Sequence, residues 1–455
     1  MVGSGIIDIL ILLISIAFIF FIFLVFRLWM WLPVLLLPVI WYIPRQTAPG
    51  GLLENYLIFR WITLIIIPLV IITQFIIMRK KSLKLSNIAL PLGLFVIFSL
   101  YSGFSNNIPV FEVLGGIFLY IRYPLLFIIF INMDMPKNIS EVFTRLFLFL
   151  TIIQIPECLF RYLVLGIGWD SISWTLGPWG HFDLGVYMIY ATALLVASDV
   201  VKGFKPVHMV LYCLFFVLAL LGEIKAFVVA APLVAILVIN FAPSQRRKGK
   251  TILVISLSAF LLICFFLTFT FWGGIYPEGS NELSGNLRKI QGKNRIERIS
   301  AFIYVWDYMK DDWHSLMFGR GPGSSLSGAF FGEGGEIKNI PLLHKNQVGA
   351  IFVDSGVTGM SLYLLMLLSL LFRLIKANRV IKNPELQIIS SAMIGMWLFY
   401  TVLGPFYDLF WRHDSPNYIF YFFAAIIYKY LYEMNHKTPA PGLKPSPAPV
   451  YEGTG

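Results

Sequence analysis

Basic side chains stand at several points where an apolar stretch of this sequence begins or ends. His344 and Lys345 directly precede a membrane-length apolar run, Lys225 opens another, and Arg161 lies near the end of a third. Arginine can clamp phosphate oxygens with two N–H groups, lysine acts as a point charge, and histidine is available as a base near neutral pH. If they lie together, these residues could bind a large anion such as a diphosphate and activate a hydroxyl group.

Arg122 lies nearer the middle of its apolar run than the other cations do. Placing an arginine at the centre of a bilayer costs about 2.5–3.5 kcal/mol on insertion scales, so we expect Arg122 to have a function. Arg161 could equally extend its side chain to lipid headgroups.

A glycine-rich stretch, FGRGPGSS at 318–325, follows a segment with helical periodicity. Apolar residues recur in that segment at Ile299, Phe302, Ile303, Trp306, Met309 or Lys310, and Trp313. This spacing predicts an amphipathic helix against the end of a helical bundle. Arg295 and Arg298 stand one turn apart at its start, where they could simply be interfacial. The three glycines allow tight turns whose N–H groups could face an anion, but no Walker motif is present.

The composition indicates which elements must position these residues. Hydrophobic residues make up 58% of the chain and charged residues 13%, which is unlike a soluble domain. Stretches long enough to cross a bilayer, about 20 residues each, recur along the chain. They predict an all-α, polytopic bundle of about twelve to fourteen transmembrane helices. The stretches are 5–26, 28–43, 56–78, 86–102, 110–131, 142–166, 183–199, 207–221, 225–242, 251–273, 345–372, 387–403 and 416–433.

Lysine and arginine cluster between these stretches and predict the orientation of the bundle. The net charge is +11, and basic residues gather at 79–84, 245–250 and 373–382. Positively charged loops favour the cytoplasmic side of a membrane. We therefore expect the basic residues to orient the transmembrane helices, and we expect no nucleic-acid partner. The chain then emerges outside after 251–273, and 274–344 forms one long extracytoplasmic loop, a feature that is usually functional. We therefore expect the functional site on the outer side.

The rest of the chain suggests one transmembrane domain, residues 1–433. The first stretch lacks a basic n-region, so we expect a retained helix rather than a signal peptide. Residues 434–455 are rich in Pro and Gly and predict a disordered cytoplasmic tail or a cloning remnant. Cys158, Cys213 and Cys264 lack metal-binding or redox spacing, so we expect no metal site.

Four segments carry a resemblance to a known family. They are GPWGHFDLGVYM (177–188), LLGEIKAFVVAAPLVAIL (220–237), RISAFIYVWDYMKDDWHSLMFGRGPGSS (298–325) and HKNQVGAIFVDSGVTG (344–359). In this order they resemble the O-antigen ligase and O-antigen polymerase superfamily of bacterial membrane glycosyltransferases. The resemblance covers about residues 177 to 370. The chain departs from the family pattern at Asp183 (usually Asn), at Lys225 (Arg), at Asp354 (Glu), and in HKN where HN is usual.

This resemblance implies inverting transfer of a glycan from undecaprenyl pyrophosphate to an acceptor hydroxyl, without cofactor or metal. By position, Lys225 and Arg298 would hold the pyrophosphate and stabilise it as it leaves. His344 would help to deprotonate the acceptor hydroxyl. The further candidates for binding pyrophosphate or glycan are Arg161, Arg122, Arg295, Asp354 and His181.

Within this class we expect a polymerase of surface polysaccharide in the bacterial inner membrane, with its site facing the periplasm. No ATP is available there, so the donor must already be activated. A ligase that joins the glycan to lipid A core is the first alternative, and a lipid-linked oligosaccharide flippase is an alternative of another class. A flippase should show internal repeats, and none is evident. The expected partners are the lipid-linked oligosaccharide, the acceptor glycan, the lipid bilayer and a chain-length regulator protein.

Overall fold

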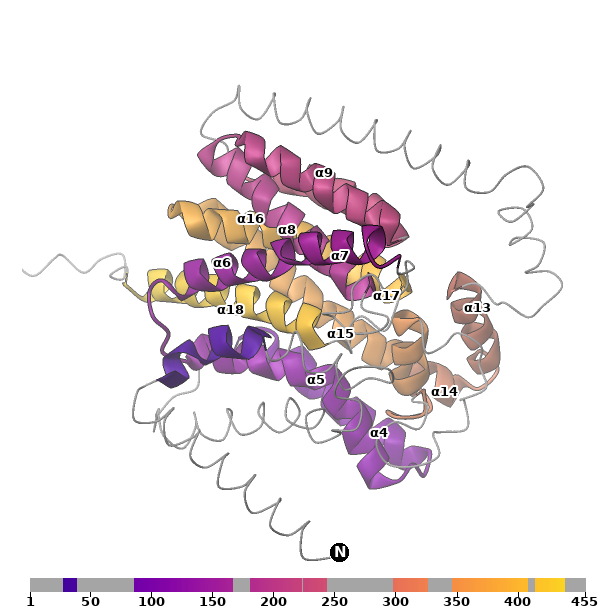
Figure 1. Cartoon of the computed structure of the whole chain (residues 1–455). Helices are drawn as coiled ribbons and strands as arrows, with labels where there is room; N and C mark the ends of the chain where they lie inside the picture. Colours follow the sequence, from indigo (N-terminus) through magenta and orange to yellow (C-terminus); the bar gives the residue numbers. More distant parts are fainter. Residues whose placement is uncertain are drawn as a thin grey trace, which may run out of the picture.

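The computed structural model describes six parts of the chain: residues 28–38, 86–166, 181–243 without 223, 298–325, 346–407 and 414–437. Every regular element within them is helical (Figure 1), which confirms the all-α prediction for the described residues. The predicted stretches 5–26, 56–78 and 251–273 lie outside these parts, as does most of the tail.

Ten helices of the described chain form a bundle in which most run lengthwise (Figure 1). They are α4 (Ala89–Ser105), α5 (Val110–Asn132), α6 (Ile139–Ile152), α7 (Gln154–Leu163), α8 (His181–Lys202), α9 (Pro206–Leu221), α10 (Lys225–Phe241), α15 (Gln347–Val380), α16 (Pro384–Leu398) and α18 (Asp414–Lys437). The shorter elements are a 3-10 helix η1 (Leu28–Trp31), α13 (Arg298–Met309), α14 (Trp313–Phe318), a π-helical turn η5 (Phe399–Leu403) and α17 (Gly404–Tyr407). All of the described bundle helices correspond to predicted apolar stretches.

One predicted stretch, 142–166, forms two helices instead of one. Helix α6 ends at Ile152 and α7 begins at Gln154. Pro156 explains the break, because a proline ring clashes with the carbonyl four residues earlier, which here belongs to Ile152.

Five helical segments of the described chain are long and apolar enough to cross a membrane. They are Val110–Asn132, Ile139–Leu163, Asp183–Lys202, Gln347–Val380 and Pro384–Leu403. Shorter apolar helices cover Ala89–Ser105, Pro206–Leu221 and Phe227–Phe241. These helices are compatible with a multi-pass membrane protein.

Helix α8 lies at the centre of the bundle and packs against α6, α10 and α16. In its most apolar part 94% of the residues are buried, as expected of a helix at the centre of a bundle. Helix α18 packs against α5 and α6 mainly through aromatic rings, with Phe422 lying 5.3 Å from Phe130 and 4.1 Å from Phe143 between ring centroids. Helix α15 packs between α4 and α16.

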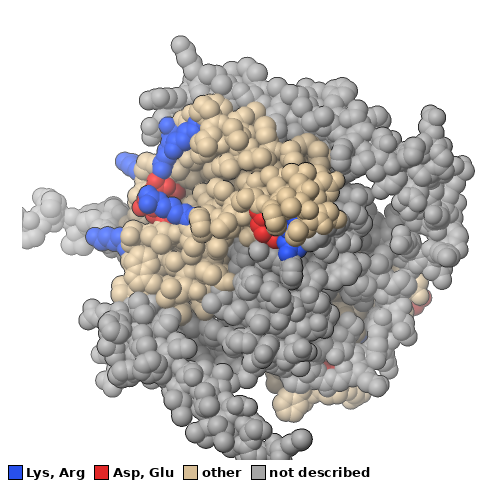
Figure 2. Space-filling view, viewed as in Figure 1, with Lys and Arg blue, Asp and Glu red and all other residues tan. Residues whose placement is uncertain are grey.

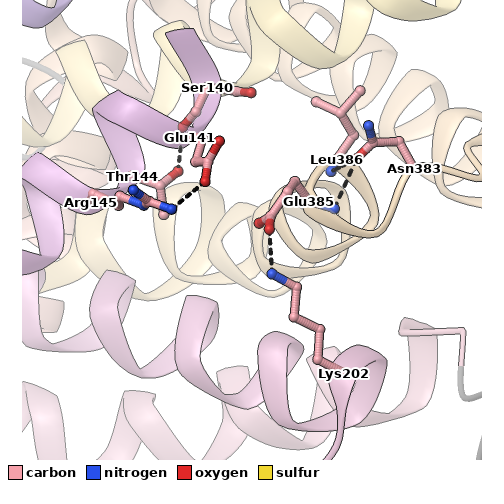
Figure 3. Close-up of polar contacts among 8 residues, drawn as sticks. All are labelled: Ser140, Glu141, Thr144, Arg145, Lys202, Asn383, Glu385 and Leu386. Atoms are coloured by element: carbon pink, nitrogen blue, oxygen red, sulfur yellow. Dashed lines mark hydrogen bonds and ion pairs between the residues drawn. The ribbon is translucent and has the colours of Figure 1, made fainter. Parts of the chain in front are cut away.

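Polar contacts tie helix ends together at one end of the bundle (Figure 3). Lys202, at the end of α8, forms an ion pair with Glu385 in the first turn of α16. Asn383 caps α16 by accepting a hydrogen bond from the backbone N–H of Glu385 at 2.9 Å. Basic side chains gather at this end, on the left in Figure 2. The basic end of α15, within the predicted cytoplasmic stretch 373–382, leads into α16. We call this end of the bundle, with Lys202 and the start of α16, the basic end.

Candidate functional site

The glycine loop, residues 319–325, lies at the opposite end of the bundle, directly after α14. Gly319, Gly321 and Gly323 have φ angles of 82°, 99° and 97°, which other residues rarely adopt. The N–H of Arg320 donates to the carbonyl of Val353 in α15 at 2.7 Å. The prediction of tight turns in this stretch is therefore confirmed.

Asp354 fastens the glycine loop to α15. Its side chain is fully buried and accepts hydrogen bonds from the Ser325 N–H at 2.9 Å, the Ser325 hydroxyl at 2.8 Å and the Ser324 hydroxyl at 3.2 Å. The Tyr120 hydroxyl of α5 donates to the same carboxylate at 3.0 Å. A buried carboxylate must be satisfied by such donors, and here they come from two separate parts of the chain, the glycine loop and α5. Asp354 therefore positions the loop.

Two glycines let the loop and α15 approach each other at backbone distance. Helix α15 is kinked at Gly356, where φ is 63° and ψ is −166°. A Cβ on Gly356 would lie 2.6 Å from the backbone nitrogen of Gly319. A Cβ on Gly319 would lie 2.5 Å from the backbone nitrogen of Ser355. Neither position can accept a side chain without moving the backbone.

The other side of the loop packs against α4 and α5. The carbonyl of Gly319 accepts from the Ser102 hydroxyl at 3.1 Å and from the Asn106 amide at 3.2 Å. A Cβ on Gly116 of α5 would lie 2.5 Å from the backbone nitrogen of Gly323. Gly321 and Gly323 are buried by this packing. The glycines thus serve close packing, and the Ser325 N–H of the loop faces the carboxylate of Asp354.

The predicted amphipathic helix is present, but its buried face matches the predicted stripe only in part, and it ends earlier. Val305 and Met309 of α13 are buried against Phe352 and Val353 of α15, whereas Ile303 is 54% exposed. The predicted stripe also included Trp313, which belongs to α14 and is 68% exposed. The kinked start of α15 selects which apolar stripe of α13 is covered.

Asp312 separates α13 from α14. Its carboxylate accepts from the His314 N–H at 3.1 Å and from the Ser315 hydroxyl at 2.5 Å, so it caps α14. These hydrogen bonds, that of the Ser315 hydroxyl above all, and the nearby Arg320 lower the pKa of Asp312 below its usual value. The cap is therefore ionised at neutral pH and is lost only as the pH falls through this lowered pKa.

The structure describes the backbone of three predicted site residues. Arg298 begins α13, Lys225 begins α10 and His181 begins α8. His344 and Arg295 lie outside the described residues, although His344 precedes by two positions Asn346, the buried N-cap of α15. His181, Lys225 and Arg298 are thus each the first residue of a helix, and the sequence predicts this place for Lys225 and Arg298.

Arg161 and Arg122 lie elsewhere in the bundle. The Arg161 Nε is 2.5 Å from the Glu157 carboxylate on the same helix, α7, which packs against α6 and α9. Arg122 is 4% exposed, and its guanidinium carbon lies 4.9 Å from the centroid of the Tyr123 ring. Residues two apart do not share a helix face, so Arg122 and Tyr120 lie on different faces of α5. The hydrogen bonds described above for the glycine loop involve neither arginine.

Sequence reasoning missed two residues near the glycine loop. Arg320 is the charged residue within the loop, and a charge between two strained glycines could have drawn attention to it. Gln347, the first residue of α15, is fully buried, and in the described structure neither its amide nitrogen nor its amide oxygen has a hydrogen-bond partner. No sequence pattern signals that burial.

Gln347→Leu should separate folding from function. Leaving a buried amide unpaired costs about 1–3 kcal/mol, so leucine should raise or preserve the free energy of unfolding. If the amide also binds the glycan that the resemblance implies, the same variant should lose about tenfold in activity. Thermal unfolding in detergent and a glycan-transfer assay on one preparation check both effects. A less stable but fully active variant would contradict this view of Gln347.

Among the described residues, no group of three or more His, Cys, Asp or Glu side chains could hold a metal ion. No protein-family model matches the chain, and no curated protein is significantly similar to it. Any functional conclusion therefore depends on the four sequence segments and on how the described parts of them are arranged.

Proposed function

We propose that the protein is a membrane glycosyltransferase that extends a surface polysaccharide from lipid-linked repeat units at the outer face of the bacterial inner membrane. One observation carries the proposal: the glycine loop, α13 and the start of α15 form one interlocked unit. Asp354 holds the loop, and α13 packs on Phe352 and Val353. The segments that carry Arg298 and His344 thereby adjoin the same kinked helix.

Lys225 belongs to the same end of the bundle through a series of contacts. Ile224, directly before it, packs so closely on Gly185 of α8 that a Cβ there would lie 2.4 Å from the isoleucine side chain. The start of α8 joins the start of α18 through the Tyr187 and Ser415 hydroxyls. Helix α17, shortly before α18, contacts α13 and α15. These contacts support the proposal that Lys225, at the start of α10, lies at the same end of the bundle as Arg298, at the start of α13.

The chemistry that this region would support is a displacement at the anomeric carbon of the donor sugar. The acceptor hydroxyl oxygen forms a bond to that carbon, and the bond from carbon to the diphosphate oxygen breaks. His344 would take the hydroxyl proton, and undecaprenyl pyrophosphate would leave with both bonding electrons. Arg298 and Lys225 would stabilise the negative charge that develops on the diphosphate. Attack opposite the leaving group inverts the anomeric configuration.

The basic end of the bundle supports the proposed orientation. Positively charged segments favour the cytoplasm. Figure 2 shows basic side chains at the left, and Figure 1, in the same view, shows α14, which the glycine loop follows, at the right. The partners that follow are a lipid-linked donor, an acceptor glycan, the bilayer and a chain-length regulator. We favour a polymerase because polymerases accept many repeat units, which suits a chain that departs from the family pattern at Lys225 and Asp354.

A reconstituted assay distinguishes the candidate activities. Purified protein is supplied with an undecaprenyl-pyrophosphate-linked repeat unit in proteoliposomes, and the products are resolved by length. A growing ladder is expected for a polymerase, whereas a single addition to lipid A core would indicate a ligase. Movement of the substrate across the bilayer without any new glycosidic bond would indicate a flippase and overturn the proposal.

A further inference from the structure

Arg320 projects from a loop whose backbone is buried. The backbone is fixed on both sides by Gly319 and Gly321, each with positive φ, and by the hydrogen bond to Val353. The side chain is 32% exposed, so the guanidinium reaches the surface from a rigid base. Preorganisation of this kind lowers the entropic cost of binding a ligand.

The guanidinium is oriented but retains hydrogen-bonding capacity. It lies over the Tyr308 ring, with its central carbon 5.6 Å from the ring centroid. One terminal nitrogen is 3.6 Å from the Asp312 carboxylate, too far for a hydrogen bond. The Nε is buried without a hydrogen-bond partner in the described structure. The terminal nitrogens of a partly exposed guanidinium that is held in place can donate to two oxygens of a phosphate.

Exposed aromatic side chains lie on the two short helices that precede the glycine loop. Tyr304 is 49% exposed, Tyr308 is 45% exposed and Trp313 is 68% exposed, all on α13 or α14. Figure 1 shows α13 at the end of the bundle, beyond the start of α15, on which the glycine loop packs. In membrane proteins Trp and Tyr collect at the depth of the lipid headgroups. Arg320 would then lie at the depth of phosphate groups.

The site is separate from the one proposed around Arg298. Tyr308, which holds the Arg320 guanidinium, is ten residues along α13 from Arg298, a rise of about 15 Å. Arg298 and Arg320 therefore approach α13 near its opposite ends. We propose that Arg320 forms a second phosphate-binding site, which takes either a phospholipid headgroup or the diphosphate of a second lipid-linked molecule. The second source rests on the proposed function, because polymerisation joins two lipid-linked glycans.

Binding measurements on the full chain in detergent test the second site. Arg320→Gln, Arg320→Lys and the wild type are compared for binding of undecaprenyl pyrophosphate, and for phosphatidylglycerol adducts by native mass spectrometry. Lys310→Gln is the matched control, because Lys310 is an exposed cation at the same end that pairs with Asp307. We expect Arg320→Gln to weaken one of the two ligands about tenfold, Arg320→Lys to weaken it less, and Lys310→Gln to leave both unchanged.

The ligand affected identifies the source of the phosphate. Loss of phosphatidylglycerol adducts alone would assign a bilayer lipid, and weaker undecaprenyl pyrophosphate binding would assign a second lipid-linked molecule. Unchanged binding of both ligands in Arg320→Gln would overturn the site. If Arg320→Gln fails to fold, Asp312→Asn replaces it: asparagine still caps α14 and removes a neighbouring negative charge, so phosphate binding should tighten. Unchanged binding in Asp312→Asn would then overturn the site.

These outcomes are independent of glycan transfer. A protein that transfers no glycan but loses phosphatidylglycerol adducts on Arg320→Gln would disprove the proposed function and leave the phosphate site standing. If the protein is a polymerase and Arg320→Gln binds undecaprenyl pyrophosphate and phosphatidylglycerol as tightly as wild type does, the proposed function stands and the phosphate site at Arg320 is disproved.

Discussion

Asp354→Ala should lower the free energy of unfolding by about 3–5 kcal/mol and abolish activity, because it removes a buried carboxylate and leaves its donors without a partner. Tyr120, Ser324 and Ser325 supply those donors from α5 and from the glycine loop. Without the carboxylate, the loop loses its attachment to α15. Unfolding by detergent or heat, followed in the presence of a constant lipid concentration, measures the loss.

Asp307→Asn is the matched control for Asp354→Ala. The Asp307 side chain is 57% exposed on α13 and pairs only with Lys310 among the described residues. Exposed ion pairs contribute about 0–1 kcal/mol, so this variant should be close to wild type in stability. Equal effects of the two substitutions would show that Asp354 does not fasten the loop.

Gly356→Ala should destabilise the protein by about 2 kcal/mol or more and strongly reduce activity. The φ and ψ angles at Gly356 belong to a region that only glycine adopts readily, which costs about 1–3 kcal/mol for another residue. The added Cβ would also press on the backbone of Gly319 and Met317. Crowding of this kind adds about 1–3 kcal/mol.

Gly93→Ala provides the opposite result as a control. Gly93 lies within α4, and a Cβ there would meet no atom within 4 Å. Alanine favours the helix by about 0.5–1 kcal/mol, so this variant should be slightly more stable than wild type and fully active. If Gly356→Ala resembles Gly93→Ala, the kink does not require glycine.

Hydropathy predicted the described helices well, because each apolar stretch must satisfy its backbone hydrogen bonds internally and therefore becomes a helix. Local chemistry also predicted the turns at Gly319, Gly321 and Gly323. Pro156 was overlooked, and with it the division of 142–166 into α6 and α7. That division depends on one residue, which an average over a long window conceals.

Contacts between distant parts of the chain could not be predicted. Tyr120 and Asp354 are 234 positions apart, and no spacing rule joins them. The sequence therefore suggested Asp354 as a substrate ligand, whereas the structure shows a buried carboxylate that positions the loop. Likewise, the predicted stripe of α13 included Met309 but not Val305, and both are buried by packing against Phe352 and Val353. Arg320 was missed because its role depends on which parts of the loop are buried.

The central claim is that the end of the bundle with the glycine loop carries out glycan transfer. The most direct test is the initial rate of ladder formation by wild type, His344→Ala and Arg298→Ala in proteoliposomes, with each variant shown to unfold at the wild-type temperature. Removing a general base costs about 10²–10⁴-fold, and removing a donor that stabilises transition-state charge costs about 10²–10³-fold. We expect losses of this size in both variants. If the wild type makes a ladder and both folded variants make it at the same rate, the claim is contradicted.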